Sequence, residues 1–258
     1  MAVQGGYRVV RISRARRALA AGQEMAQGRH LMFGLVEVDL TEPLRLMAEH
    51  KARYGERLSV AGYVTACLAR TLRELPELNG FRRGSSIVLL DEVIVVVLVE
   101  RLIDSQSAVG YLPIRHADTK SLVDITREIR AEQASPPRVV PGQRWLEMLP
   151  AAAAPFVMRW ASRSIGWALR FGTAGVNNLG FGRLAGWGLA PGAGTVAVTI
   201  GGISPEDRPD GSQRQIAHLT LTFDHDVVDG APAARFTSRL IARLVSGEAV
   251  AEVQEDAS

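Results

Sequence analysis

The chain is 258 residues long, 47% of its residues are hydrophobic, and 30 Lys and Arg residues stand against 27 Asp and Glu residues. A chain of this length and composition can bury one substantial core, so we expect a single domain. The formal net charge of +3 is small, and the arginines are interspersed with acidic residues. This balance argues against a nucleic-acid-binding surface.

Cys67 is the only cysteine, which excludes an intramolecular disulfide and agrees with a reducing compartment. Five arginines within the first 17 residues leave no uninterrupted apolar core for a signal peptide. No window of about twenty apolar residues is free of charge, so we expect no transmembrane span and a cytoplasmic protein. With one cysteine and no close pair of histidines, the sequence predicts no metal site.

Caps and apolar spacing predict the elements of the first third of the chain. These are a basic helix over 13–27, a strand over 31–40, a helix over 41–54 ended by Gly55, and a long helix over 59–75. Cys67 lies in the last of these helices, whose Ala- and Leu-rich pattern indicates a buried thiol. His50 lies in the charged run Glu49-His50-Lys51, and we expect it to be solvated.

The remaining elements alternate without a strict strand–helix repeat. We expect strands over 87–90, 93–99, 109–114, 195–200 and 215–223, and helices over 122–132 and 232–245. The strand over 93–99 is apolar on both faces, so it is predicted to be central and covered on each side. The pattern favours an α/β sandwich built on a mixed sheet.

The segment 142–171 stands apart as an amphipathic helical region. Its aromatic residues fall on one side and its arginines on another: Phe156, Trp160, Trp167 and Phe171 against Arg159, Arg163 and Arg170. A basic amphipathic helix can lie on a membrane surface or line the entry path of a lipid-like substrate. It can also pack on the protein's own sheet or on a neighbouring subunit. We favour packing, since core contact is the usual fate of an apolar stripe.

The segment from Phe223 to Phe236, FDHDVVDGAPAARF, carries the clearest functional signal. The preceding strand delivers His225 into a tight turn, and Gly230 frees the backbone before a helix begins. A histidine at such an edge can be held in one tautomer and act as a general base. Asp229 could fix the turn through backbone or arginine hydrogen bonds. On the local pattern alone, a strand–turn–helix junction with an incidental His and Asp is the simpler interpretation.

Other segments of the sequence favour a functional role for His225 over an incidental one. His-x-x-x-Asp-Gly followed by an Ala-rich helix resembles the signature of the chloramphenicol acetyltransferase-like superfamily. The closest resemblance is to the catalytic domain of the dihydrolipoyl acyltransferases of 2-oxoacid dehydrogenase complexes. Further similar segments follow in the family's order: Ser13–Arg16, Glu37–Thr41, Leu72–Asn79, Tyr111–Ser121 and Val176–Gly180.

The resemblance implies a chloramphenicol acetyltransferase-like two-layer sandwich, with a mixed sheet covered by helices. The catalytic-type domain would span 13–248 and include the helical segment 142–171. An N-terminal extension over 1–12 and a C-terminal tail over 249–258 would flank it.

The resemblance also implies a mechanism. His225 would remove the proton of the acceptor, which attacks the acyl thioester of coenzyme A directly in a ternary complex. Asp229 would be mainly structural, paired with Arg16, with Gly230 supporting the turn. The site would lie between subunits of a homotrimer that can assemble further. His30, Tyr111 and Pro113 would line the channel that coenzyme A and the small-molecule acceptor enter.

Two residues depart from the family's pattern. Asn177 stands where the family has a serine that donates to the oxyanion from an adjacent subunit. An asparagine amide can donate too, but losing such a donor lowers rates about 100- to 1000-fold. Asp226 replaces a basic residue after His225 and could raise the pKa of that histidine. We expect no tightly bound cofactor, and neither a lipoyl domain nor a flexible linker precedes Ser13.

Three hypotheses follow for the function. The first is a stand-alone, coenzyme A-dependent acyltransferase that moves an acyl group between the thioester and a thiol or hydroxyl acceptor. The second is a catalytically impaired family member that acts as a structural or assembly core, motivated by Asn177 and Asp226. The third is a lipid-modifying acyltransferase that uses residues 156–171 at a membrane, a peripheral contact that we favour least.

Overall fold

The computed structural model describes residues 3–4, 7–8, 28–103, 106–135, 153–192 and 194–256. The expected helix over 13–27, with Arg16, lies outside these residues. The strands are β1 (Val3–Gln4), β2 (Tyr7–Arg8), β3 (Leu31–Asp39), β4 (Gly80–Arg83), β5 (Ser86–Leu89), β6 (Val95–Ile103), β7 (Gln106–Ile114), β8 (Ala174–Asn178), β9 (Val196–Asp207) and β10 (Gln213–Asp224). The helices are α2 (Thr41–Tyr54), α3 (Val60–Glu74), the 3-10 turn η2 (Pro76–Leu78), α4 (Leu122–Ala134), α6 (Ala154–Ala161), α7 (Ile165–Phe171), α8 (Gly230–Ser246) and α9 (Glu248–Asp256).

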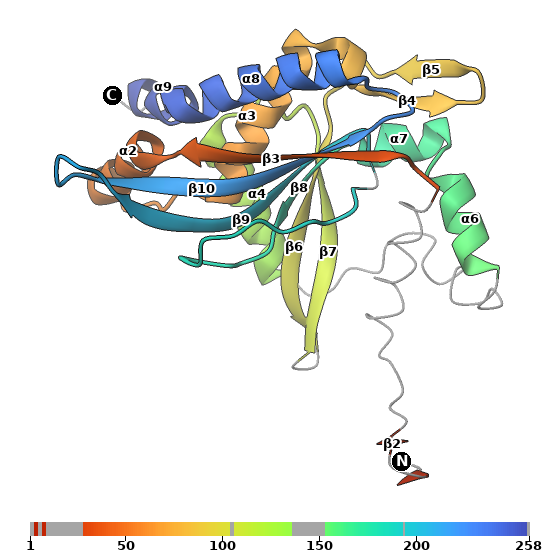
Figure 1. Ribbon diagram of the computed structural model, residues 1–258, viewed down its shortest axis with the longest axis horizontal. Coiled ribbons are helices and arrows are strands. Elements are labelled where there is room, and N and C mark those ends of the chain that lie inside the picture. The colour runs from red at the N-terminus through yellow and green to blue at the C-terminus, as the bar shows by residue number, and fades with distance from the viewer. Residues whose placement is uncertain are drawn as a thin grey trace.

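A six-stranded mixed sheet in the order β3-β10-β9-β8-β6-β7 forms the centre of the molecule (Figure 1). β10 pairs antiparallel with both β3 and β9. β8 pairs parallel with β9 and with β6, and β6 pairs antiparallel with β7. The α/β class and the mixed sheet predicted from the sequence are therefore confirmed.

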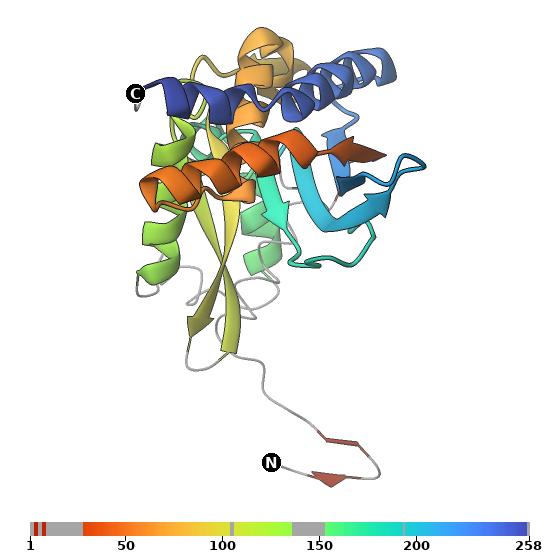
Figure 2. The same cartoon turned by 90° about the vertical axis from the view of Figure 1, so that its left-hand side faces the viewer.

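Helices cover one face of this sheet (Figures 1 and 2). α3 lies at the middle of that layer, and its Val64, Leu68 and Leu72 are fully buried, as their spacing predicts. Ser59 begins α3 by accepting a hydrogen bond from the backbone N–H of Gly62 at 3.3 Å, which satisfies one of the free donors of the first turn. Alternate residues of the strands, such as Val97 and Leu221, close the core from the sheet side.

On the opposite face of the sheet, which we call the outer face, the described residues form no helical layer. On β3, Phe33 is 43% and Leu35 is 54% exposed. The loop that follows β8 crosses β9 so closely that a Cβ on Gly202 would lie 1.5 Å from the carbonyl oxygen of Leu184. The strand predicted over 93–99 begins at Val95, and its outward residues are only partly buried. Coverage on both sides, as expected from its apolar sequence, is thus wrong for the single chain.

Three further elements differ from expectation. The hairpin of β4 and β5 forms a separate two-stranded sheet, and only its second strand was predicted. Residues 249–256, expected to be part of a tail, form most of α9, and Ala249, Val250 and Val253 join the core. The amphipathic segment is two short helices, because α7 starts anew at its Ser164 cap. Among the described helices, none has the length and apolarity that a membrane span requires.

Candidate active site

His225 lies just beyond the end of β10, in a turn fixed by backbone hydrogen bonds. Its N–H donates to the carbonyl oxygen of His30 at 2.7 Å, which ties the turn to the start of β3. The N–H groups of Val227 and Val228 both donate to the carbonyl oxygen of Asp224 at 3.0 Å. Val228 is buried, and α8 starts at Gly230. The junction predicted from the sequence is present, with its histidine half exposed at the sheet's end.

A buried ion pair between Arg29 and Asp224 stabilises this turn. Nη1 of Arg29 lies 2.5 Å from Oδ2 of Asp224, and the two side chains are 6% and 5% exposed. The other carboxylate oxygen of Asp224 accepts from the N–H of Asp226 at 3.1 Å. The sequence analysis missed this pair. One feature of the sequence could have indicated this pair. Arg29 comes directly before His30, and Asp224 comes directly before His225.

Asp226 contacts two side chains from other elements. Its Oδ1 lies 2.8 Å from Nδ1 of His30 and 3.4 Å from Nη1 of Arg82 on β4. The hydrogen bond with His30 holds the pKa of the Asp226 carboxyl below its ordinary value, and the charges of His30, Arg82 and Arg163 act in the same direction. The expected effect of Asp226 on His225 stays a prediction. The carboxylate joins the β4–β5 hairpin to the start of β3.

The carboxylate of Asp229 is exposed, and its expected pairing with Arg16 stays a prediction. Its carboxylate is 85% exposed, and Oδ1 lies 3.7 Å from Nδ1 of His225, which is beyond hydrogen-bond distance. Arg16, its expected partner, lies outside the described residues. Asp229 remains the residue before α8, and its backbone carbonyl accepts from the N–H of Ala233 at 3.0 Å. The clamp that the structure shows is Arg29 with Asp224.

Asn177 and Tyr111 lie on the outer face of the sheet, together with Pro113. Asn177 follows the buried Val176 on β8, so its side chain points to the opposite side of the strand, and it is partly buried. Tyr111 pairs with Leu98 and Pro113 with Val96, both outward residues of β6. Burial raises the pKa of the Tyr111 hydroxyl. These three residues form a second group on one face, as a channel lining would require.

The two groups are separated within one chain. Asn177 is level with Thr199 on β9 and through it with Thr220 on β10. His225 is five positions further along β10, which corresponds to roughly 17 Å of extended chain. His30, with its side chain 79% exposed, belongs to the His225 group. A single chain therefore does not bring Asn177 to His225.

The remaining candidates add no second site. Cys67 is fully buried in α3, and burial raises the pKa of its thiol to about 12, so the reactive thiolate is strongly disfavoured. Among the residues that the structure describes, no three His, Cys, Asp or Glu side chains are grouped to hold a metal ion.

The fold is that of chloramphenicol acetyltransferase and related acyltransferase cores. A chloramphenicol acetyltransferase superimposes with a TM-score of 0.53 at 13% identity, over 88% of this chain and 94% of that one. The cubic core of a pyruvate dehydrogenase multienzyme complex gives a TM-score of 0.70 at 22% identity, over 95% of this chain and 94% of that one.

Two dihydrolipoamide acetyltransferases share the fold at similar levels. A probable one from Listeria monocytogenes 4b F2365 has a TM-score of 0.66 at 22% identity, over 93% of this chain and 94% of that one. The other is the E2p protein of Azotobacter vinelandii, in a study of a serine, a histidine and an asparagine in its catalytic mechanism. It has a TM-score of 0.69 at 22% identity, over 95% of this chain and 94% of that one.

Residues 194–251 match the family of the 2-oxoacid dehydrogenases acyltransferase (catalytic domain). This match contains β9, β10, the His225 turn, all of α8 and the start of α9. The resemblance inferred from the sequence is thus confirmed, by the family match over this segment and by the solved structures for the fold. No curated protein sequence matches the chain significantly.

Proposed function

We propose that the protein is a coenzyme A-dependent acyltransferase in which His225 acts as the general base. The observation that carries the proposal is the His225 turn itself, held by the buried Arg29–Asp224 pair within the segment that matches the family. A half-exposed imidazole on a rigid turn can meet a substrate, and the ordinary pKa range of histidine suits proton transfer near neutral pH. The Azotobacter vinelandii histidine and asparagine are four residues apart, as are His225 and Asp229.

The proposed reaction transfers the acyl group in one displacement. His225 takes the proton from the thiol or hydroxyl of the acceptor, and the acceptor's sulfur or oxygen bonds to the thioester carbonyl carbon. The tetrahedral intermediate then loses coenzyme A, whose sulfur receives the proton from the imidazolium. The negative carbonyl oxygen requires a hydrogen-bond donor, and the side-chain amide of Asn177 can supply one.

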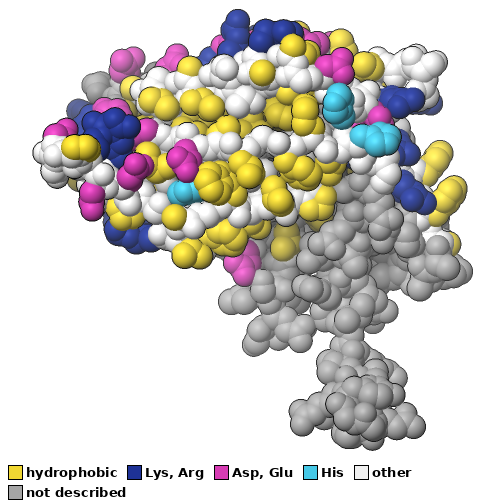
Figure 3. Space-filling model, in the orientation of Figure 1, with side chains coloured by type: hydrophobic (Ala, Val, Ile, Leu, Met, Phe, Trp, Pro, Cys, Tyr) yellow, Lys and Arg dark blue, Asp and Glu magenta, His cyan; other side chains and the backbone are white. Residues whose placement is uncertain are grey.

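Because Asn177 and His225 are far apart in one chain, the proposal requires a second copy. The outer face that carries Asn177 also exposes Phe33 and Leu35 on β3 and Leu184 and Leu189 in the loop after β8, with exposed fractions of 43%, 54%, 67% and 64%. Figure 3 shows hydrophobic side chains gathered over β3, β10 and β9 on this face. Large exposed apolar patches mark interaction sites. We propose that the outer face packs against a neighbouring copy in a homotrimer, whose His225 turn meets Asn177.

An assay with small-molecule substrates tests the assignment of His225 as the general base. Acetyl-coenzyme A is incubated with dihydrolipoamide or a small alcohol, and released coenzyme A is measured by chromatography. His225→Ala should lower the rate at least about 100-fold, as expected for the loss of a general base. The exposed His116, in the turn after β7, which lies four strands from β10 in the sheet, provides the control His116→Asn, which should leave the rate unchanged. Equal rates for the wild type and His225→Ala would refute the assigned base.

The alternative is a family member that keeps the fold as an assembly core without turnover. Asn177 at the family's serine position favours it. Calorimetric titration with coenzyme A and acetyl-coenzyme A separates the two proposals. Saturable binding by the oligomer supports the enzyme, whereas an oligomer that binds neither compound supports the structural role.

A further inference from the structure

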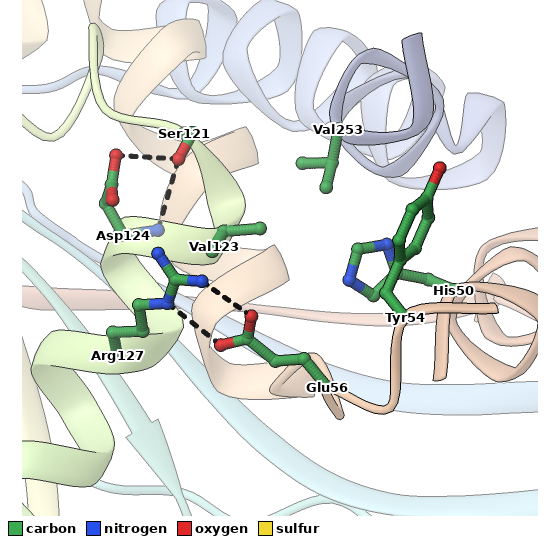
Figure 4. Close-up of a pocket in the computed structure, with 8 residues that line it drawn as sticks. All are labelled: His50, Tyr54, Glu56, Ser121, Val123, Asp124, Arg127 and Val253. Carbon is green, nitrogen blue, oxygen red and sulfur yellow. Dashed lines mark hydrogen bonds and ion pairs between the residues drawn. The ribbon is translucent and has the colours of Figure 1, made fainter. Parts of the chain in front are cut away.

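A hollow of about 420 Å³ lies between α2, α4 and α9, away from the His225 turn. His50 and Tyr54 of α2 line one side, Val123 and Arg127 of α4 the other, and Val253 of α9 closes a third (Figure 4). This volume falls within the range of small-molecule sites. No residue of the His225 turn or of the Asn177 group lines it.

His50 and Tyr54 carry polar atoms that lack partners. His50 is only 3% exposed, contrary to the solvated position expected from its charged neighbours. Both of its ring nitrogens are buried without a hydrogen bond, and so is the hydroxyl of Tyr54. The two rings lie side by side, with centroids 4.8 Å apart. Leaving one such group unpaired costs about 1–3 kcal/mol, so a neighbouring cluster of them indicates a missing partner.

Two of the charged groups around the hollow are paired with each other, and the third bonds to a neutral hydroxyl. The guanidinium of Arg127 donates two hydrogen bonds to the carboxylate of Glu56, at 2.8 and 3.0 Å. These bonds hold the pKa of Glu56 below its ordinary value. Asp124 accepts from the hydroxyl of Ser121 at 2.7 Å. Two carboxylates and one guanidinium disfavour an anion, and a cation would have to compete with the hydrogen bonds that Glu56 and Asp124 already accept.

We propose that this hollow binds an uncharged small molecule that carries a hydrogen-bond donor and an acceptor on a flat apolar body, such as a primary aromatic amide. A neutral imidazole offers one donor and one acceptor, and the tyrosine hydroxyl can play either part. A carboxamide can bond to both kinds of group at once. The faces of His50 and Tyr54 and the side chains of Val123 and Val253 supply the apolar walls. The anionic coenzyme A is excluded on charge.

Three probes of the same shape and different charge test this proposal. Benzamide is neutral, benzoate is an anion and benzamidine is a cation, and each is titrated into isotope-labelled protein while amide chemical shifts are followed. Benzamide should bind saturably and perturb α2, α4 and α9, with at least tenfold tighter binding than either charged probe. If no probe saturates, or if a charged probe binds more tightly than benzamide, the proposal is overturned.

Two variants locate the binding. His50→Phe keeps an aromatic ring of similar size without the nitrogens, and Tyr54→Phe removes only the hydroxyl. At least one of them should weaken benzamide binding tenfold or more. The control Glu77→Gln changes an exposed acid outside the hollow and should have no effect. Unchanged affinity in both aromatic variants would overturn the proposal. Acyl transfer plays no part in these readouts, so failure here leaves the assignment of His225 unaffected.

Discussion

Arg29 and Asp224 bring opposite charges into contact across 195 positions of sequence, with both side chains almost fully removed from water. Removing two charges from water is costly, and their attraction offsets that cost only while both are present. The pair joins the start of β3 to the end of β10. It therefore fixes where His225 emerges, and it stabilises the turn only as long as both partners remain.

We expect Arg29→Met to destabilise the fold by about 3–5 kcal/mol, because it leaves the Asp224 carboxylate buried and unpaired. Urea unfolding followed by circular dichroism measures the change. Arg45→Met serves as the matched control, since Arg45 pairs with exposed carboxylates on α2 and should lose at most about 1 kcal/mol. Similar losses in the two variants would contradict the importance of the buried pair.

The lowered pKa of Asp226 predicts that the stability of the fold depends on pH in the acidic range. Its folded-state pKa lies below the ordinary value of 3.8, so its bonds to His30 and Arg82 stabilise the fold above that pH. This contribution is lost as the pH falls through the lowered folded-state pKa. Asp226→Asn should therefore lose a small part of the stability at pH 6 and very little at pH 2. Unfolding measured at both pH values checks this difference, and an equal loss at each would contradict it.

At the scale of the elements, periodicity and caps predict most helices well. α3 and α4 begin after the serine caps Ser59 and Ser121, and α2 ends at Gly55, whose positive φ of 72° suits glycine. β9 extends seven residues beyond its predicted end at Ile200, whereas β10 exceeds its predicted range by only two residues at its start and one at its end. Their additional residues are partly polar, and they stay extended because each pairs with the other.

α9 is the element that local pattern predicted least well, and it has a measurable role. Ending the chain after Gly247 would remove the buried Ala249, Val250 and Val253 from the core. Each buried side chain of this size contributes about 1–3 kcal/mol, so we expect a marked drop in the thermal midpoint. Differential scanning calorimetry of the truncated chain measures it. A chain that ends after Asp256 is the control and should melt like the full chain.

At the scale of the whole molecule, the two faces of the sheet differ in how they are covered. Helices bury one face, whereas the outer face presents Asn177 among exposed apolar side chains. His225 lies at the sheet's end, level with neither Asn177 nor Tyr111. In the proposed function, Asn177 and His225 would therefore meet only if copies associate.

This arrangement predicts that association and activity fail together. Leu35→Lys places a charge on the outer face at a side chain that is 54% exposed, so the fold should remain intact. Sedimentation should show dissociation of the trimer, and acyl transfer should fall with it by at least tenfold. Ile87→Lys on β5 is the control, because Ile87 is similarly exposed at 51% but lies away from the outer face. A monomeric Leu35→Lys variant that retains full activity would contradict a shared site.

The amino-acid sequence by itself determined the α/β class, most helices and the strand–turn–helix that carries His225. These features depend on local spacing, caps and glycine, which are readable without long-range contacts. The tertiary structure alone decided that Arg29 meets Asp224, that Asp226 binds His30, and that His50 is buried beside a hollow. Each of these depends on which side chains the sheet order and the helix packing bring together. Sequence neighbours do not specify this, since distant segments supply the partners.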